Sequence, residues 1–392
     1  MENNKTPSIR FKGFTDPWEQ RKLGDIVGIY DGVHQTPNYQ NSGVMFLSVE
    51  NIATLKSSKF ISEEDFKRDY KIFPQENDIL MTRIGDVGTT NVVTDNSLKA
   101  YYVSLALLKY KSTDPYFLSN AIQSDYVQKG LANRTLKTAI PMKINKDEIG
   151  KVSVMLPLSA TEQQQIGTYF RNLDNLITLH QRKYDKLQNI KKSMLEKMFP
   201  KNGSNVPEIR FSGFTDPWEQ RKLGDVVPIT MGQSPDGSTY SDTPSDYILV
   251  QGNADLQNGW VSPRVWTSQM TKKADAGDLI MSVRAPAGAM GKTAYNVVIG
   301  RGVAAIKGNE FIYQLLVKMN SDGYWKVLSC GSTFESLNSD NIKNADVLIP
   351  DVAEQEKIGE YFVNLDRLIT LHQRELEKLQ NIKKSMLEKM FV

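Results

Sequence analysis

The sequence contains two pairs of nearly identical segments, and these repeats constrain its fold more than any other feature. The segment IRFKGFTDPWEQRKLGD begins at Ile9 and returns from Ile209 with one difference. The segment LITLHQRKYDKLQNIKKSMLEKMF begins at Leu176 and returns from Leu368 with three differences. Repeats of this kind indicate that one structural unit is used more than once. Because the stretches between the repeats differ, the chain is predicted to use one scaffold twice to present two different surfaces.

The two intervening stretches retain only faint similarities, such as NDILMTRIGDVG from Asn77 and GDLIMSVRAPAG from Gly277. The runs GVMFLSV, NDILMTRI and VSLALLKY in the first stretch predict strands, as do DYILVQG, GDLIMSVR and GVAAI in the second. Short helices are predicted near 117–127 and 311–320. The predicted fold class is therefore α+β, with two variable domains that are each followed by a long helix.

Each long helix is predicted to begin with a capping box, in which Ser159 precedes Glu162 and Asp351 precedes Glu354 by three residues. Apolar residues then recur in heptad-like steps, which is the pattern of a coiled-coil seam. A helix of this length would span roughly 60 Å, more than one small domain can cover. We therefore predict that the two helices pair as an antiparallel coiled coil, with packing of each helix on its own domain as the alternative. The predicted seam residues are Ile166, Phe170, Leu173, Ile177, Leu187, Ile358, Phe362, Leu365, Ile369 and Leu379.

These patterns divide the chain into five predicted parts. The turn-rich stretch KNGSNVP marks a linker between the first helix and the second repeat. The predicted boundaries are 1–158 for the first variable domain, 159–200 for the central long helix, 201–208 for the linker, 209–350 for the second variable domain and 351–392 for the C-terminal long helix.

Composition sets only broad limits. The 392 residues carry a formal net charge of +3, and this mild basicity permits a nucleic-acid partner without requiring one. The single cysteine, Cys330, cannot form an intrachain disulfide. The first ten residues are polar, and no apolar run approaches the length of a membrane span. We therefore expect a cytoplasmic protein that does not enter a membrane.

The sequence carries no recognisable catalytic, cofactor-binding or metal-binding motif. The segment GAMGKT resembles a phosphate loop, but Pro286 stands where that motif requires glycine. His180 and His372 fall on the predicted helix seam without a pattern of acidic or thiol ligands, which favours packed side chains over a metal site. We therefore expect a non-catalytic chain that holds no cofactor and no metal.

Two polar turns occupy the same place in each repeat, GVHQTPNY from Gly32 and GQSPDGSTY from Gly232. Gln can pair in bidentate fashion with adenine and Arg with guanine, while Tyr can reach a phosphate. The alternative is an ordinary loop, since Gly and Pro form turns anyway. Basic residues that follow the strands would form a phosphate-binding set, although each one alone fits an ordinary surface charge. The candidate DNA-contacting residues are His34, Gln35, Thr36, Asn38, Tyr39, Arg83, Arg134, Lys137, Lys143, Gln233, Ser234, Tyr240, Arg284, Lys292 and Arg301.

The order of these parts resembles the specificity subunits of type I restriction–modification systems over nearly the whole chain. The resemblance is carried by GFTDPWEQRKLGD at the start of each half, the two polar turns, the helix entries LPLSATEQQQI and IPDVAEQEKI, and the repeated helix ends. It implies two target-recognition domains that each read one half of a split, asymmetric DNA site. It also implies two modification subunits that methylate adenine, and restriction subunits that translocate and cleave DNA. S-adenosylmethionine, ATP and Mg²⁺ would then belong to those partners.

Two other functions fit the same sequence features. A tandem DNA-binding module without restriction partners would bind DNA tightly by itself and would not copurify with a methyltransferase. A purely structural coiled-coil adaptor would show no salt-dependent affinity for DNA.

Overall fold

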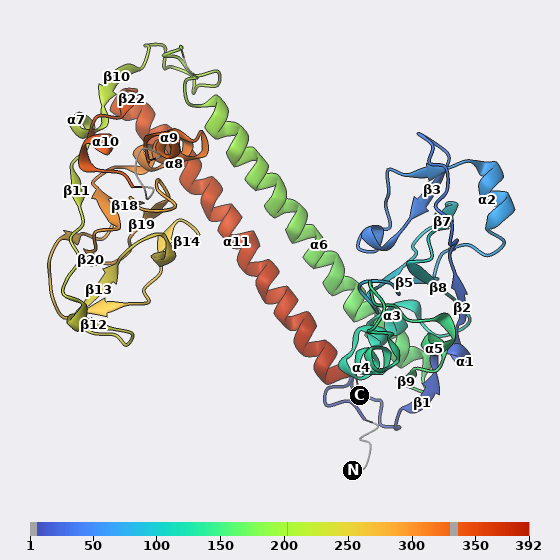
Figure 1. Ribbon diagram of the computed structural model, residues 1–392. Coiled ribbons are helices and arrows are strands. Elements are labelled where there is room, and N and C mark those ends of the chain that lie inside the picture. The colour runs from blue at the N-terminus through green and yellow to red at the C-terminus, as the bar shows by residue number, and fades with distance from the viewer. Residues whose placement is uncertain (1–5, 202, 330–335, 392) are drawn as a thin grey trace. The chain divides into compact units, whose positions relative to one another are not determined.

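The computed structural model describes residues 6–201, 203–329 and 336–391 (Figure 1). Contacts along the chain divide it into two compact units. The first unit combines Met1–Gln181 with Gln373–Val392, and the second comprises Arg182–His372. Both units contain sheets and helices, so the predicted α+β class is confirmed, as are the two long helices α6 (Ala160–Lys197) and α11 (Val352–Met390). No helix among the described residues has the length and apolar character needed to cross a membrane.

The first unit is built on three small sheets. An antiparallel sheet has the strand order β2-β8-β5-β6, a second has the order β4-β3-β7 with β3 and β7 parallel, and β1 pairs with β9. The strands are β1 (Glu19–Lys22), β2 (Gly28–Asp31), β3 (Val44–Leu47), β4 (Phe60–Ile61), β5 (Ile79–Thr82), β6 (Thr90–Val92), β7 (Lys99–Tyr101), β8 (Leu105–Lys109) and β9 (Ser153–Leu156). The short helices are α1 (Leu23–Ile26), η1 (Val49–Asn51), α2 (Glu63–Asp69), α3 (Pro115–Gln123), α4 (Asp125–Arg134) and α5 (Lys146–Gly150).

The helix predicted near 117–127 is two helices. Ser124 lies between α3 and α4 with an extended backbone (φ −69°, ψ 153°), and its hydroxyl donates to the carbonyl of Ala121 at 2.7 Å. Serine competes for backbone groups in this way and therefore favours helix ends over helix interiors. The break lets α4 leave the direction of α3.

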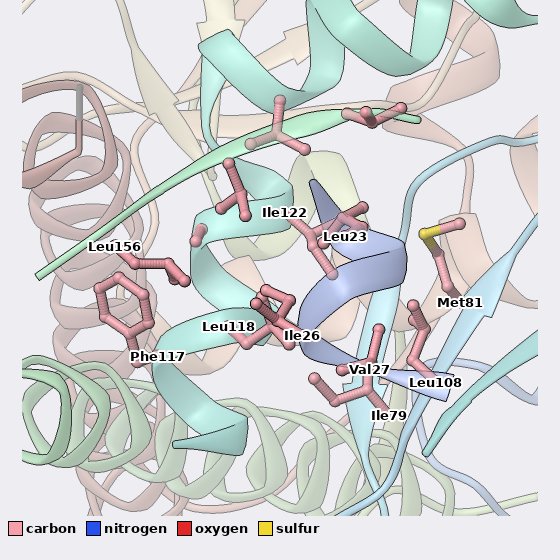
Figure 2. Packing of buried hydrophobic residues seen from close by; sticks show 14 of the residues in the cluster. Leu23, Ile26, Val27, Ile79, Met81, Leu108, Phe117, Leu118, Ile122 and Leu156 are labelled. Carbon is pink, nitrogen blue, oxygen red and sulfur yellow. The ribbon is translucent and has the colours of Figure 1, made fainter. Parts of the chain in front are cut away.

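Strands β5 and β8 are buried on both faces because the four-stranded sheet separates two hydrophobic cores. Ile79 and Met81 face the core that contains Trp18 and α3, whereas Leu80 faces the core under β3. Figure 2 shows the first of these cores, with Met81 and Leu108 from the sheet opposite side chains of α1 and α3. This alternation, with successive side chains on opposite faces, also fixes the direction of the residues that follow β5.

The second unit repeats this plan with more strands. Its sheets have the orders β11-β21-β18-β19-β15-β14, β12-β16-β13-β20-β17 and β10-β22. The strands are β10 (Glu219–Lys222), β11 (Ile229–Met231), β12 (Tyr240–Ser241), β13 (Tyr247–Val250), β14 (Leu256–Gln257), β15 (Trp260–Val261), β16 (Trp266–Thr267), β17 (Lys273–Ala274), β18 (Leu279–Ser282), β19 (Met290–Lys292), β20 (Val297–Ile299), β21 (Val303–Ile306) and β22 (Asp346–Ile349). The short helices are α7 (Leu223–Val226), η2 (Gly237–Thr239), η3 (Asn253–Asp255), α8 (Glu310–Ser321), α9 (Tyr324–Ser329) and α10 (Ser339–Lys343).

The two long helices meet inside each unit. In the first unit Lys383 of α11 forms an ion pair with Asp174 of α6 at 2.6 Å, and in the second unit Lys191 of α6 pairs with Asp366 of α11 at the same distance. Most predicted seam residues are buried, and Ile177, Leu187 and Leu379 are half-buried. Pairing of the helices over their full lengths stays a prediction, since each unit holds only part of each helix.

Candidate nucleic-acid interface

The polar turn of the first unit leaves the sheet at the end of β2. Gly32 begins it because a Cβ at this position would clash with the carbonyl oxygen of Tyr101, so the backbone can approach β7 only with glycine here. The turn is held by the hydrogen bond from the amide of Val33 to that same carbonyl, at 3.2 Å. Beyond this anchor the predicted contact residues His34, Gln35, Thr36, Asn38 and Tyr39 are all exposed.

Tyr39 is held firmly although it is exposed. Its ring lies edge-on to Phe46 with the centroids 5.5 Å apart, and the ammonium group of Lys59 lies 5.6 Å from its centroid. The turn also forms one wall of an open groove of about 650 Å³, whose other wall is Ile61 and residues of α2 and its C-terminal end. Arg68 lies in this groove and forms ion pairs with both Asp65 and Asp69. The groove therefore offers exposed amide and imidazole groups from the turn, while its opposite wall carries two aspartates and one arginine.

Arg83 was predicted to contact DNA, but the structure places it in the interior. It is 5% exposed, forms an ion pair with Asp31 and donates from Nε to the carbonyl of Ile144 at 3.0 Å. Burial lowers the pKa of its guanidinium. Arg83 follows Ile79 and Met81 on the core face of the sheet, so strand alternation turns it inward. Its position favours a role in holding the polar turn against the loop that precedes Ile144.

Three further candidates are exposed here, Arg134 at the end of α4 and Lys137 and Lys143 on that loop. Arg134 lies 3.7 Å from Glu148, a distance at which the ion pair is weak, whereas Lys137 and Lys143 lie on the loop itself. The amide of Gly85 donates to the carbonyl of Met142 at 2.8 Å. The loop is thereby fixed to the segment that follows β5, beside the polar turn.

In the second unit the structure brings Gln233, Ser234 and Arg301 together. The amide of Gln233 donates to the carbonyl of Ile299 at 2.9 Å, and the amide of Arg301 donates to the hydroxyl of Ser234 at 3.2 Å. The side chains of Gln233 and Arg301 are exposed, while Ser234 is half-buried. Tyr240 is also half-buried and donates to the carbonyl of Pro235 at 3.3 Å, so it stabilises the turn from within.

Arg284 and Lys292 have different surroundings. Arg284 is exposed and follows Val283, which occupies the inward position that Arg83 has in the first unit. The ammonium group of Lys292 is 2.9 Å from Glu310 and lies over the rings of Tyr313 and Trp260, at 4.6 and 4.9 Å from their centroids. Arg284 is therefore available to a ligand, whereas the contacts of Lys292 favour a structural role.

Sequence reasoning missed a buried ion pair that positions each domain on its helix. Glu162 is 1% exposed and accepts two hydrogen bonds from Arg10, at 2.6 and 2.8 Å, and one from the indole of Trp18 at 3.3 Å. The hydrogen bond to Glu162 raises the pKa of Arg10. These carboxylate contacts go beyond the predicted capping box, of which the bond from the amide of Glu162 to Ser159 is present at 3.4 Å.

The second unit repeats this ion pair with Arg210, Trp218 and Glu354. The signal in the sequence was the near-identity of the two boxes, which contain both the Arg and the Trp. Among the described residues, no group of His, Cys, Asp and Glu side chains is arranged to hold a metal ion.

Comparison with known proteins agrees with this duplicated plan. The family described as "Type I restriction modification DNA specificity domain" matches residues 15–189 and again 215–381. A Methanocaldococcus jannaschii protein assigned as the MjaX specificity subunit of a type I restriction enzyme is 26% identical, over 95% of this chain and 92% of its own length. The MjaVIII specificity subunit of the same organism is 21% identical, over 95% and 91%.

Two solved structures show the same fold. The S subunit of a type I restriction-modification system from M. genitalium has a TM-score of 0.72 at 14% identity and covers 99% of both chains. A chain from a study of type I R-M complex assembly and conformational transition has a TM-score of 0.50 at 19% identity, over 94% of this chain and 96% of its own. Two family matches together span more than half of the sequence, and the chain therefore belongs to the type I restriction–modification DNA specificity family, with two specificity domains in tandem.

Proposed function

We propose that this chain is the DNA-reading subunit of a type I restriction–modification complex, in which each domain reads one half of a bipartite, asymmetric site. The observation that carries the proposal is that two turns with the same backbone anchoring expose different side chains. The turns after Gly32 and Gly232 are anchored in the same way, yet they expose His34 and Gln35 in one domain and Gln233 in the other. Two domains of this kind would read two different half-sites.

Exposed surfaces on the two long helices are suited to binding one partner in each unit. An open groove along α11 between Arg374 and Met386 lies in the first unit, and its counterpart along α6 between Arg182 and Met194 lies in the second. Each unit also exposes two leucines of the repeated helix segment, at fractions between 45% and 51%. These leucines are Leu176 and Leu179 in the first unit and Leu368 and Leu371 in the second. Equivalent surfaces present twice are suited to two copies of one partner, which we propose to be the modification subunit.

In the proposed complex the chemistry is carried by the partners. The modification subunits would bind S-adenosylmethionine and methylate adenine, and the restriction subunits would use ATP and Mg²⁺ to translocate and cleave DNA. The chain itself would act without a cofactor, as a non-catalytic subunit in the cytoplasm. The two long helices, paired as an antiparallel coiled coil, would set the distance between the half-sites.

Coexpression with the modification subunit encoded by the same host tests this proposal. Native mass spectrometry should find one copy of this chain with two copies of the modification subunit. Sequencing of methylated bases in the host genome should then find one split motif with unequal halves. A chain that binds DNA tightly and never acquires a modification subunit would instead be a tandem DNA-binding module. A chain without salt-dependent DNA affinity would be a structural adaptor.

A further inference from the structure

The loop between α4 and α5 closes on itself near its base. The amide of Leu136 donates to the carbonyl of Lys143 at 2.8 Å, and the amide of Ile144 donates to the carbonyl of Arg83 at 3.0 Å. On either side of the loop, Leu131 and Ile144 are buried in the core of the first unit, at 1% and 0% exposure. Residues 137–142 therefore project from a fixed base. We call residues 133–145, which comprise this projection and its flanks, the basic loop.

The tip of the basic loop is apolar and open to solvent. Ile140 is 100% exposed, and Leu136 and Met142 are 45% and 46% exposed. One exposed apolar side chain is common on a protein surface. Three on one short loop, with an isoleucine that no part of the described chain covers, indicate a surface that is buried against a partner.

The charge around the tip identifies that partner as DNA. Residues 133–145 contain Arg134, Lys137 and Lys143 and no acidic residue. An apolar tip between cations fits a nucleic acid, because the cations can contact phosphates while the apolar tip is removed from water and buried between the bases. The position agrees with this, since Arg83 binds both Asp31 at the base of the polar turn and Ile144 at the base of the loop.

We propose that the basic loop is a wedge, whose Ile140 and Met142 enter a groove of the first half-site and unstack one base step. The proposal rests on the proposed function and extends it from reading bases to deforming them. Proteins that insert Ile or Met between base steps kink the duplex, and the energy of the kink depends on the step that is deformed. The wedge would therefore contribute specificity at a position that no side chain contacts by hydrogen bonds.

The test uses the complete complex with its modification subunits and a duplex that contains the methylated site found by sequencing. In a series of duplexes, 2-aminopurine replaces one base at a time across the site. Outside the target adenines, which methyltransferase subunits flip out of the stack in any case, fluorescence with the wild-type chain should rise at one step of the first half-site and remain low at the corresponding steps of the second. The Ile140→Ala, Met142→Ala double variant should lose this rise and bind the duplex about tenfold more weakly, because less apolar surface is buried.

Two control variants separate the possible results. Leu158→Ala removes an equally apolar side chain, 65% exposed, outside the basic loop, and should change neither signal. Lys137→Gln with Lys143→Gln should reduce the salt dependence of binding while the rise in fluorescence remains at saturating complex. The two lysine substitutions therefore distinguish insertion of the apolar tip from electrostatic attraction by the flanking lysines.

The outcomes also distinguish this proposal from the one on which it rests. If the wild-type complex does not prefer the motif found by sequencing to random DNA, the proposed function fails. If it prefers that site but no step outside the target adenines shows a rise in fluorescence, or the double variant matches the wild type, the wedge is wrong and the reading function stands. A double variant that keeps its DNA affinity and loses a modification subunit would show that the tip contacts protein, which also overturns the wedge.

Discussion

Phe391 lies edge-on against Trp18 in the core of the first unit, with ring centroids 6.1 Å apart and planes inclined by 77°. Phe199 has the same relationship to Trp218 in the second unit, at 5.8 Å and 84°. Phe391 follows helix α11, which begins in the second unit, and Phe199 follows α6, which begins in the first. Each long helix therefore starts in the core of one unit and completes the core of the other.

This exchange predicts that each unit loses stability when the end of the distant helix is altered. Phe391→Ala should lower the free energy of unfolding of the first unit by about 3 kcal/mol, the lower end for a buried Phe because the site lies near a helix terminus. Hydrogen exchange should become faster in peptides around Trp18 and Phe117, with little change in the second unit. Phe199→Ala is the matched control and should reverse the pattern. Equal effects of either variant on both units would contradict the exchange.

Much of this architecture could be predicted from the repeats, but the destination of the helix ends could not. Buried residues such as Ile166 and Phe362 were found because heptad spacing marks the covered face of a helix. The segment SMLEKMF is identical in both copies, so its sequence is compatible with packing in either core. Only the folded arrangement shows that Phe391 belongs with Trp18.

The structure exposes some of the candidate contact residues and buries others, for a similar physical reason. Spacing in the repeat and Gly and Pro content are local signals of the two turns; the candidates in the first turn are all exposed, whereas Ser234 and Tyr240 in the second are half-buried. Arg83 and Lys292 look like surface cations in the sequence, yet their partners Asp31 and Glu310 are distant in the chain. When the two repeated strand segments are aligned, Arg83 and Val283 occupy the same position. An apolar residue at the equivalent position is the signal that Arg83 points inward.

The buried carboxylate of Glu162 should matter for folding and not for DNA chemistry. Glu162→Leu leaves the cation of Arg10 without its partner and should destabilise the first unit by about 3–5 kcal/mol. Adding Arg10→Met removes the stranded charge and should restore part of that loss. Denaturant unfolding of the single and double variants measures both values. If the second substitution instead adds its own loss to the first, the ion pair does not act as a unit.

Arg284 and Arg83 should behave differently although both follow a central strand. Arg284→Ala should weaken recognition of the second half-site alone, by about 1–3 kcal/mol if the side chain is bidentate to guanine. Arg83→Met should instead lower the stability of the first unit, because Asp31 and the carbonyl of Ile144 lose a buried donor. Binding to duplexes with single substitutions in either half-site checks the first expectation. Uniform weakening across all sequences would make Arg284 a phosphate contact.

The most direct test of the two-reader account is the exchange of one variable domain. Residues 28–155 are replaced by the corresponding segment of another specificity subunit of the family, so that both repeated boxes and both long helices remain. The methylated motif is then read by sequencing a genome that carries the exchanged chain and its modification subunits. We expect one half of the motif to change while the other half and the spacer stay the same. A motif in which both halves change, or neither does, would contradict independent reading by two domains.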